Sequence, residues 1–207
     1  MTPHLPPPPV MDHALSSAVC AAGHMPEHLL IADMREKSSQ PRLWALDLSD
    51  RAAPVVVLQT WVEHGSGSDP KRTGYATTFG NRVDSDMTST GLYAVGERYR
   101  SVQYSRWSYQ LLGLDKTNSN ALVRGIALHP STFVTSTHQD WSEGCAAVPT
   151  DALPTLEKAW GSISGTYLYI DGPGAPVRTC AQYPHWPTTV SAIWQSPKLV
   201  CTVGENS

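Results

Sequence analysis

Along most of the chain, apolar residues alternate with polar ones or form short runs, which is typical of strands rather than long helices. Residues 43–48 show the alternation, because Trp44, Leu46 and Leu48 fall on one side of an extended chain. Short apolar runs predict further strands at residues 29–33, 55–62, 92–95, 109–112, 126–128 and 167–170. Turn residues separate the first three strands, which therefore predict an opening β-meander.

Two short segments have helical spacing instead. Residues 11–23 are rich in alanine and end at Gly23, and Leu153, Leu156 and Trp160 fit one face of a helix that stops at Gly161. Residues 1–10 contain too much proline for helix or sheet and predict an extended tail. Residues 64–90 are rich in Gly, Ser, Thr, Asp and Asn, and a loop of this length is more often functional than idle. The pattern predicts a mainly β domain with minor helices.

Composition narrows the class of protein. The 207 residues fit one domain of ordinary size, and a net charge of -3 gives no basic field for nucleic acid. No run approaches the roughly 18 apolar residues of a membrane span. The start of the chain has no charged segment followed by an apolar one, so an export signal is absent, already removed, or outside this sequence.

Four cysteines occur, at positions 20, 145, 180 and 201, without the paired spacing of a structural zinc site. We expect no metal and no other cofactor. Cys180 and Cys201 flank a segment rich in proline and tryptophan and could form a disulfide, or remain two separately buried thiols. Cys20 has no obvious partner and is interpreted as structural.

Cys145 is the candidate nucleophile. Gly144 precedes it and allows a sharp turn, so that the amides of Gly144 and Cys145 could point at a developing oxyanion. A thiol is mostly protonated at neutral pH and needs a base beside it. His129, which ends a predicted strand, is best placed in the sequence to be that base; the alternative is a buried thiol and an unrelated histidine.

The surrounding motifs favour catalysis. The segment from Arg124 to His129, followed by Ser142-Glu-Gly-Cys145, resembles the signature of L,D-transpeptidases of the YkuD type. The resemblance is closer to the murein L,D-transpeptidase catalytic-domain branch, on the elements His64-Gly-Ser-Gly-Ser68, Phe79-Gly-Asn81, Ser89-Thr-Gly-Leu-Tyr93 and the stretch 113–121. It implies an L,D-transpeptidase-type β-sandwich with minor helices. It also implies a Pro-rich tail and short helix at 1–25, a catalytic domain at 26–171 and a C-terminal extension at 172–207.

The resemblance further implies a reaction on peptidoglycan stem peptides in the periplasm or cell envelope. Cys145 would attack the peptide carbonyl, His129 would carry the proton, Gly144 would contribute to the oxyanion hole, and Ser142 would support the turn or the substrate. Candidates for substrate contact are His64, Ser68, Tyr93 and Arg124. His64 could equally be an exposed loop histidine, and Arg124 could bind a substrate carboxylate.

Three departures from the family pattern leave the second half-reaction open. Pro130 follows the base and lacks a backbone N–H. Glu143 stands beside the thiol and is expected to face solvent, and Ala147 replaces a common arginine. The alternatives to transpeptidation are hydrolysis, by an L,D-carboxypeptidase or a secreted cell-wall-degrading effector with a secretion-system or immunity partner, and a non-catalytic peptidoglycan-binding module.

Overall fold

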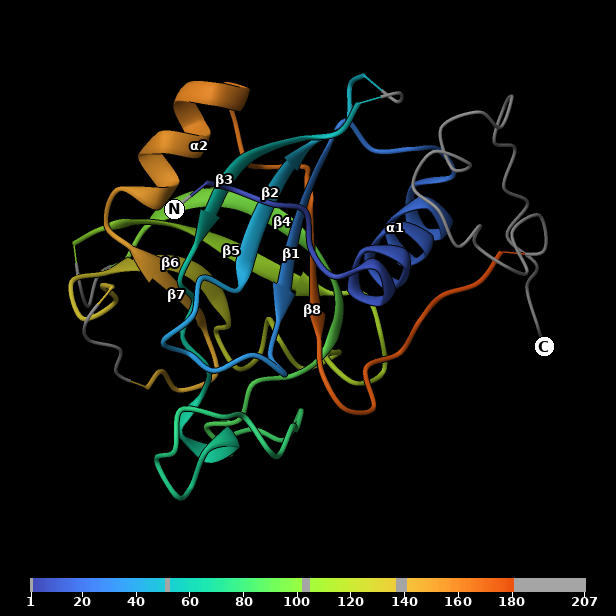
Figure 1. Cartoon of the computed structure of the whole chain (residues 1–207). Coiled ribbons are helices and arrows are strands. Elements are labelled where there is room, and N and C mark those ends of the chain that lie inside the picture. Colours follow the sequence, from blue (N-terminus) through green and yellow to red (C-terminus); the bar gives the residue numbers. More distant parts are fainter. Residues whose placement is uncertain (1, 51–52, 102–104, 137–140, 181–207) are drawn as a thin grey trace.

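The computed structural model describes residues 2–50, 53–101, 105–136 and 141–180 (Figure 1). The elements are, in order, α1 (Pro8–Ala22), β1 (His28–Asp33), β2 (Leu43–Asp47), β3 (Val55–Thr60), the 3-10 turn η1 (Ser66–Ser68), β4 (Gly91–Arg100), β5 (Trp107–Gly113), β6 (Ala127–Ser131), β7 (Ala146–Pro149), α2 (Ala152–Trp160) and β8 (Tyr167–Asp171). The predicted mainly β class with minor helices is confirmed.

The strands form an eight-stranded sheet in the order β3-β2-β1-β8-β4-β5-β6-β7. The predicted meander is confirmed, because β1, β2 and β3 pair antiparallel in succession. Two neighbouring pairs are parallel, β1 with β8 and β6 with β7. Strand β8, the last in sequence, lies between β1 and β4 and so joins the meander to the second half of the sheet (Figure 1).

The two edges of this sheet approach each other. The Glu63 N–H, just after β3, donates to the Ala147 carbonyl of β7 at 2.9 Å. The Ser66 N–H donates to the Ser142 carbonyl at 2.8 Å, and the Ser142 N–H donates to the His64 carbonyl at 3.1 Å. The sheet is therefore nearly closed into a barrel, and the residues that follow β3 lie against those that precede β7.

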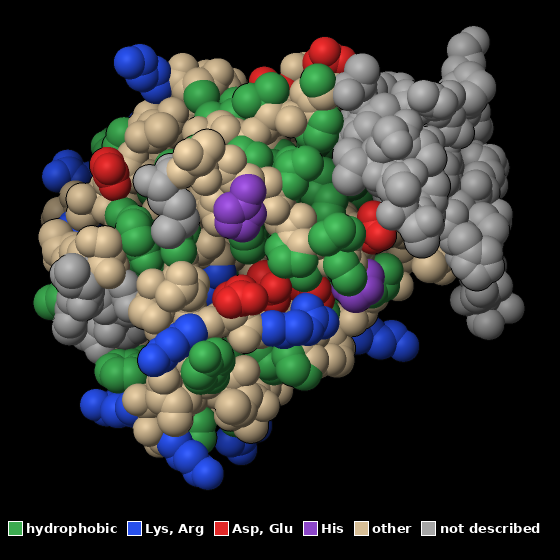
Figure 2. All heavy atoms as spheres, viewed as in Figure 1, with side chains coloured by type: hydrophobic (Ala, Val, Ile, Leu, Met, Phe, Trp, Pro, Cys, Tyr) green, Lys and Arg blue, Asp and Glu red, His purple; other side chains and the backbone are tan. Residues whose placement is uncertain are grey.

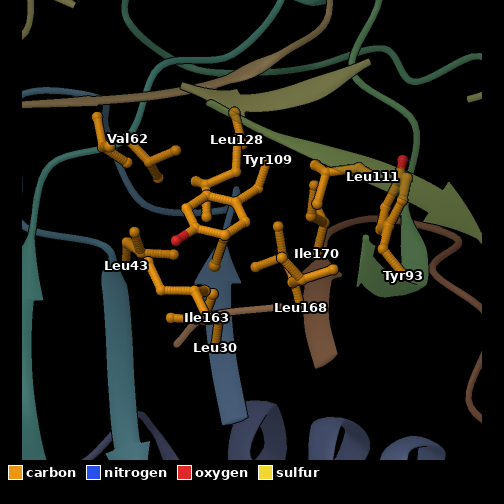
Figure 3. Packing of buried hydrophobic residues seen from close by; sticks show 14 of the residues in the cluster. Leu30, Leu43, Val62, Tyr93, Tyr109, Leu111, Leu128, Ile163, Leu168 and Ile170 are labelled. Atoms are coloured by element: carbon orange, nitrogen blue, oxygen red, sulfur yellow. The ribbon is translucent and has the colours of Figure 1, made fainter. Parts of the chain in front are cut away.

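Both faces of the sheet are covered where β1 and β8 pass beneath α1, which accounts for the apolar content of these strands. Along β1, Leu30 and Ala32 belong to the core inside the curved sheet, part of which Figure 3 shows. Leu29 and Ile31 point the other way, into a second core that packs against α1. The alternation in the sequence thus separates two buried faces rather than one buried and one exposed face.

Helix α1 begins earlier than predicted. The tail prediction is wrong for residues 8–10, because α1 starts at Pro8. Proline is tolerated in the first helical turn, where a backbone N–H has no intrahelical acceptor to lose. The end is as predicted, because Gly23 has φ 75° and its N–H donates to the Val19 carbonyl at 2.8 Å. Within the described residues, no helix is long and apolar enough to cross a membrane.

Residues 172–180 return along α1 after β8. Arg178 holds this segment in place: its N–H donates to Ser17 Oγ at 3.1 Å, its carbonyl accepts from Ser16 Oγ at 2.5 Å, and its Nε lies 2.9 Å from Asp115 Oδ1. These contacts bring the end of the described chain to the last turn of the N-terminal helix.

A disulfide joins Cys20 to Cys180 at this point, across a sequence separation of 160 residues. Of the two alternatives left open by the sequence, neither a Cys180–Cys201 bond nor a separately buried thiol holds for Cys180, and Cys201 lies outside the described residues. The structural role expected of Cys20 is confirmed. Sequence spacing favoured the nearer cysteine, whereas the return of the chain along α1 decides the pairing.

Candidate active site

Strands β6 and β7 bring His129 and Cys145 together. The two strands are parallel, with His129 opposite Ala147 and Leu128 opposite Ala146. Cys145 immediately precedes β7, so the same register places it level with Ala127. His129 and Ala147 are partners in this register, and Cys145 stands two residues before Ala147, where it packs at the margin of the core that contains Leu128 and Ala146.

Backbone groups surround the sulfur of Cys145, which is half-buried. Its Sγ lies 3.8 Å from the Gly125 carbonyl, and the Ala127 N–H donates to the sulfur. Burial raises the pKa of the Cys145 thiol, a direction that the negative charge of Glu143 reinforces and the Ala127 N–H and Arg124 oppose. The sulfur is therefore mainly a thiol at neutral pH, and attack on a carbonyl requires a base.

His129 has the tautomer that a base needs. Its Nδ1 lies 3.2 Å from the Pro130 carbonyl, which can only accept, so Nδ1 carries the proton and Nε2 keeps the lone pair. Burial lowers the pKa of His129, and the positive charge of Arg106 lowers it further. The imidazole is consequently neutral near pH 7. Proline at position 130 loses an N–H but keeps the carbonyl that this contact uses.

The turn that carries the cysteine is built on Ser142 and Gly144. Ser142 Oγ donates to the Cys145 carbonyl at 2.7 Å and accepts from the Gly144 N–H at 3.1 Å. Gly144 has φ 110°, a conformation that side chains rarely adopt. With the Gly144 N–H directed at Ser142, the role of this amide in an oxyanion hole stays a prediction. Glu143 is exposed, as expected.

Three of the four candidates for substrate contact are buried. His64 is 1% exposed, and Ser68 and Tyr93 are 0% exposed, so the alternative of an exposed loop histidine is wrong. Ser68 Oγ accepts from the Thr88 N–H at 2.9 Å, and Tyr93 OH donates to the Ser89 carbonyl at 2.8 Å. These side chains shape the 64–90 loop behind the thiol; their contact with substrate stays a prediction.

His64 belongs to a buried polar group that the sequence did not predict. Arg42 Nη2 donates to His64 Nδ1 at 2.8 Å, and His64 Nε2 lies 3.7 Å from Asp69 Oδ2. Burial, reinforced by the charge of Arg42, lowers the pKa of His64 to about 4. No local signal points to Arg42, which precedes His64 by 22 residues. His64 is therefore neutral at pH 7 and links the loop to the sheet.

Arg124, the fourth candidate, is half-buried and donates to the loop. Its Nη1 lies 3.1 Å from the Gly80 carbonyl and 3.3 Å from Ser89 Oγ, and its Nη2 lies 2.5 Å from the Met87 carbonyl. Arg124 thus lies between the 64–90 loop and the turn that carries Cys145.

Basic and acidic side chains alternate on the exposed part of this loop, with Lys71, Arg72 and Arg82 against Asp84 and Asp86. Lys71 and Arg72 are exposed on it, and the Arg72 guanidinium lies 4.9 Å from the centre of the Trp141 ring, beside the Cys145 turn. On the face shown in Figure 2, Lys and Arg side chains gather over the lower loops. Among the described residues, no group of three His, Cys, Asp or Glu side chains is placed to hold a metal ion. The described site offers a thiol, an imidazole and positive charge.

The sequence did not predict β7 or the backbone contacts of the sulfur. The run Ala146–Pro149 is short and apolar, and it could have been interpreted as a buried strand. The contacts of the sulfur with the Gly125 carbonyl and the Ala127 N–H are made by backbone groups, so the residue types do not predict them.

Comparisons with known proteins identify the family of the chain. The family description "L,D-transpeptidase catalytic domain" matches residues 7–169. A comparison with curated proteins gives no match.

Several solved structures are similar at low identity. A variant of the helical cell shape determining protein Pgp2 from Campylobacter jejuni has a TM-score of 0.49 and 10% identity, with 81% of this chain and 52% of that chain covered. An L,D-transpeptidase from Mycobacterium smegmatis has a TM-score of 0.42 and 11% identity, with 70% of this chain and 59% of that chain covered. An L,D-transpeptidase from Mycobacterium tuberculosis has a TM-score of 0.41 and 15% identity, with 72% of this chain and 59% of that chain covered. This chain thus spans between 52% and 59% of the length of these three.

Proposed function

Because the chain belongs to the L,D-transpeptidase catalytic-domain family, we propose that it transfers peptidoglycan stem peptides through a thioester on Cys145. The observation that carries this proposal is the parallel pairing of β6 with β7. It places a half-buried thiol directly before β7 and, opposite Ala147, an imidazole whose Nδ1 lies 3.2 Å from the Pro130 carbonyl. A neutral base beside a protonated thiol is the resting state from which a cysteine nucleophile is activated.

The first half-reaction uses this pair. His129 Nε2 takes the proton of the Cys145 thiol as sulfur attacks the carbonyl carbon of the peptide bond. The negative charge on the carbonyl oxygen is stabilised by the backbone N–H of Cys145, joined by that of Gly144 only if it leaves Ser142 Oγ. When the tetrahedral intermediate collapses, the C–N bond breaks, the protonated His129 gives its proton to the departing amine, and the acyl group remains on sulfur as a thioester.

In the second half-reaction an acceptor attacks the thioester. The amine of a second stem peptide gives a cross-link and returns the thiol, whereas water gives a shortened peptide. Stem peptides carry carboxylates, and Lys71 and Arg72 supply positive charge at the rim of the 64–90 loop. Pro130 keeps the carbonyl that contacts His129 Nδ1, so the base is retained and the protein is not expected to be a non-catalytic module. Hydrolysis is the second candidate, because Glu143 adds a negative charge where an anionic acceptor would approach.

We further propose that the enzyme works in the periplasm or cell envelope. The Cys20–Cys180 disulfide supports this, because such bonds persist in oxidising compartments and are rare in the cytosol. Peptide mapping by mass spectrometry of protein taken from the envelope, with and without reductant, tests it. A difference of two protons across the Cys20 and Cys180 peptides supports the proposal, and two free thiols would oppose it.

Product analysis tests the reaction. The wild-type protein and Cys145→Ala are incubated with disaccharide-tetrapeptide, with and without added D-amino acids, and the products are identified by mass spectrometry. Dimers or exchange products indicate transpeptidation, and tripeptide alone indicates hydrolysis. The double variant Cys20→Ser, Cys180→Ser serves as the matched control, since it removes sulfur away from β7 and should keep the product pattern. Product formation that survives Cys145→Ala rejects the proposed nucleophile.

A further inference from the structure

Arg124 has a position that its expected role does not explain. A guanidinium that binds a substrate carboxylate presents a free edge with two parallel N–H groups. Here both terminal nitrogens already donate to protein acceptors, Nη1 to the Gly80 carbonyl and Ser89 Oγ, and Nη2 to the Met87 carbonyl. Three of its five N–H groups, all on the terminal nitrogens, are thus directed into the loop.

The turn that carries the nucleophile lies directly against this guanidinium. A Cβ added at Gly144 would lie 2.6 Å from Arg124 Nη2 and 2.7 Å from the Met87 carbonyl oxygen. Position 144 therefore requires glycine for two reasons, its φ of 110° and the close approach of Arg124. The guanidinium touches the residue next to the sulfur.

The positive charge of Arg124 has no carboxylate partner among the described residues. None of the ion pairs found among the described residues includes Arg124. Its hydrogen-bond acceptors are two backbone carbonyls and a hydroxyl. A charge that neutral dipoles hold in place still acts on nearby titratable groups. The nearest group that becomes an anion during the proposed reaction is the Cys145 thiol.

We infer that Arg124 is a positioning residue, which fixes the turn carrying Cys145 and stabilises its thiolate, rather than a ligand for a substrate carboxylate. The inference rests on the proposed role of Cys145 as nucleophile.

Charged groups around the sulfur shift the pKa of the Cys145 thiol in opposite directions. The Glu143 charge raises the pKa of Cys145, and the Arg124 charge lowers it. Tyr93 and Tyr99 each have a pKa raised mainly by burial, and in both the negative charge of a Cys145 thiolate contributes to the increase. With His129 as the base, Arg124 is the permanent cation of this group, so its removal should shift the titration of the thiol.

Alkylation by iodoacetamide measures that titration without any substrate. The rate of modification of Cys145 is followed against pH by peptide mass spectrometry under non-reducing conditions. Arg124→Met should raise the midpoint by about one pH unit. Because the thiolate fraction then falls, the rate at pH 7 should fall about tenfold. Arg124→Lys keeps the charge and should titrate near wild type, although one ammonium cannot reach all three acceptors.

Arg82→Met is the matched control, because it removes one positive charge from an exposed position of the same loop and should leave the midpoint unchanged. An unchanged midpoint in Arg124→Met overturns the inference, and so does a raised KM for tetrapeptide as its only effect. If melting curves show that Arg124→Met does not fold, Arg124→Lys decides: an upward shift of about one unit would overturn the inference. A shifted midpoint in a protein that leaves tetrapeptide intact would reject the proposed function and keep the inference.

Discussion

The two sides of the molecule are held together by different forces. Where α1 packs on β1 and β8, the contacts are apolar and buried, as with Leu15 and Leu29, both 0% exposed. The 64–90 loop beside the thiol is held by hydrogen bonds between backbone and side chains, such as those of Ser68 and Arg124. Apolar burial scales with area and tolerates small shifts, whereas a hydrogen-bonded loop fixes positions.

The difference predicts that stability and activity can be perturbed separately. Changes in the α1 side should lower the free energy of unfolding and leave turnover by the surviving folded protein unchanged. Changes in the loop side should alter reactivity at Cys145 by more than they alter stability. The predictions below test this separation, from the largest effect to the smallest.

His129→Ala should lower turnover about 1,000-fold, because a positioned general base contributes on the order of 10²–10⁴. The melting temperature should change little, since the imidazole is only half-buried. Steady-state kinetics with tetrapeptide and thermal melting measure the two effects. His24→Ala is the matched control, because His24 Nδ1 contacts the carbonyl of the next residue, Met25, at 3.0 Å in the same way. Full activity in His129→Ala would refute its assignment as base.

Leu15→Ala should lower the free energy of unfolding by about 3 kcal/mol, as truncation of a buried leucine leaves a cavity. Chemical denaturation measures this, and kcat of the folded fraction should stay at the wild-type value. The matched control is Leu122→Ala, at a position that is 59% exposed. A kcat that falls in proportion to stability would show that the two sides are not independent.

The pH dependence of stability should report on His64. Its folded pKa of about 4 lies below its ordinary value of 6.5, so the unfolded chain binds a proton that the folded chain does not. This contribution is complete above pH 6.5 and is lost as the pH falls towards 4, amounting to about 3 kcal/mol. Denaturation of wild type and His64→Gln between pH 7 and 4 should show a flatter curve for the variant. Equal slopes would contradict the buried neutral state.

Ser68→Ala should cost about 2 kcal/mol locally, because the Thr88 N–H loses its acceptor in a buried site. Since the loop contacts the Cys145 turn, we expect the rate of Cys145 alkylation to fall while the melting temperature changes by only a few degrees. Thr88→Ser is the control, because it keeps the hydroxyl that accepts from the Gly65 N–H at 2.8 Å. A large loss of stability with an unchanged rate of Cys145 alkylation would show that the loop contributes to stability rather than to reactivity.

Much of the fold could be predicted from the sequence, because burial imposes a period on each strand. The meander and the helix that ends at Gly23 follow from local patterns. Strand β7 was missed, since a run of four residues carries little period and only its apolar character marks it as a possible buried strand. The Cys20–Cys180 bond depends on a return of the chain that no local pattern encodes.

The site divides in the same way. Cys145 and His129 stand in motifs whose residues are close in sequence, so the pair can be predicted from the amino-acid sequence alone. The roles of Pro130 and Gly125 rest on their carbonyls, which every residue has. The contact of Arg42 with His64 joins a strand to a loop and leaves no mark in either segment. Side-chain chemistry is visible in a sequence, whereas backbone contacts require the fold.

The formation of a thioester on Cys145 is the central claim, and trapping the acyl-enzyme tests it most directly. The protein is mixed with disaccharide-tetrapeptide, quenched in acid within seconds, and mapped by peptide mass spectrometry. We expect an added mass equal to the acyl part of the substrate on the Cys145 peptide, sensitive to hydroxylamine and absent from His129→Ala. An adduct on another residue, or turnover of tetrapeptide with Cys145 unmodified at every quench time, would contradict it.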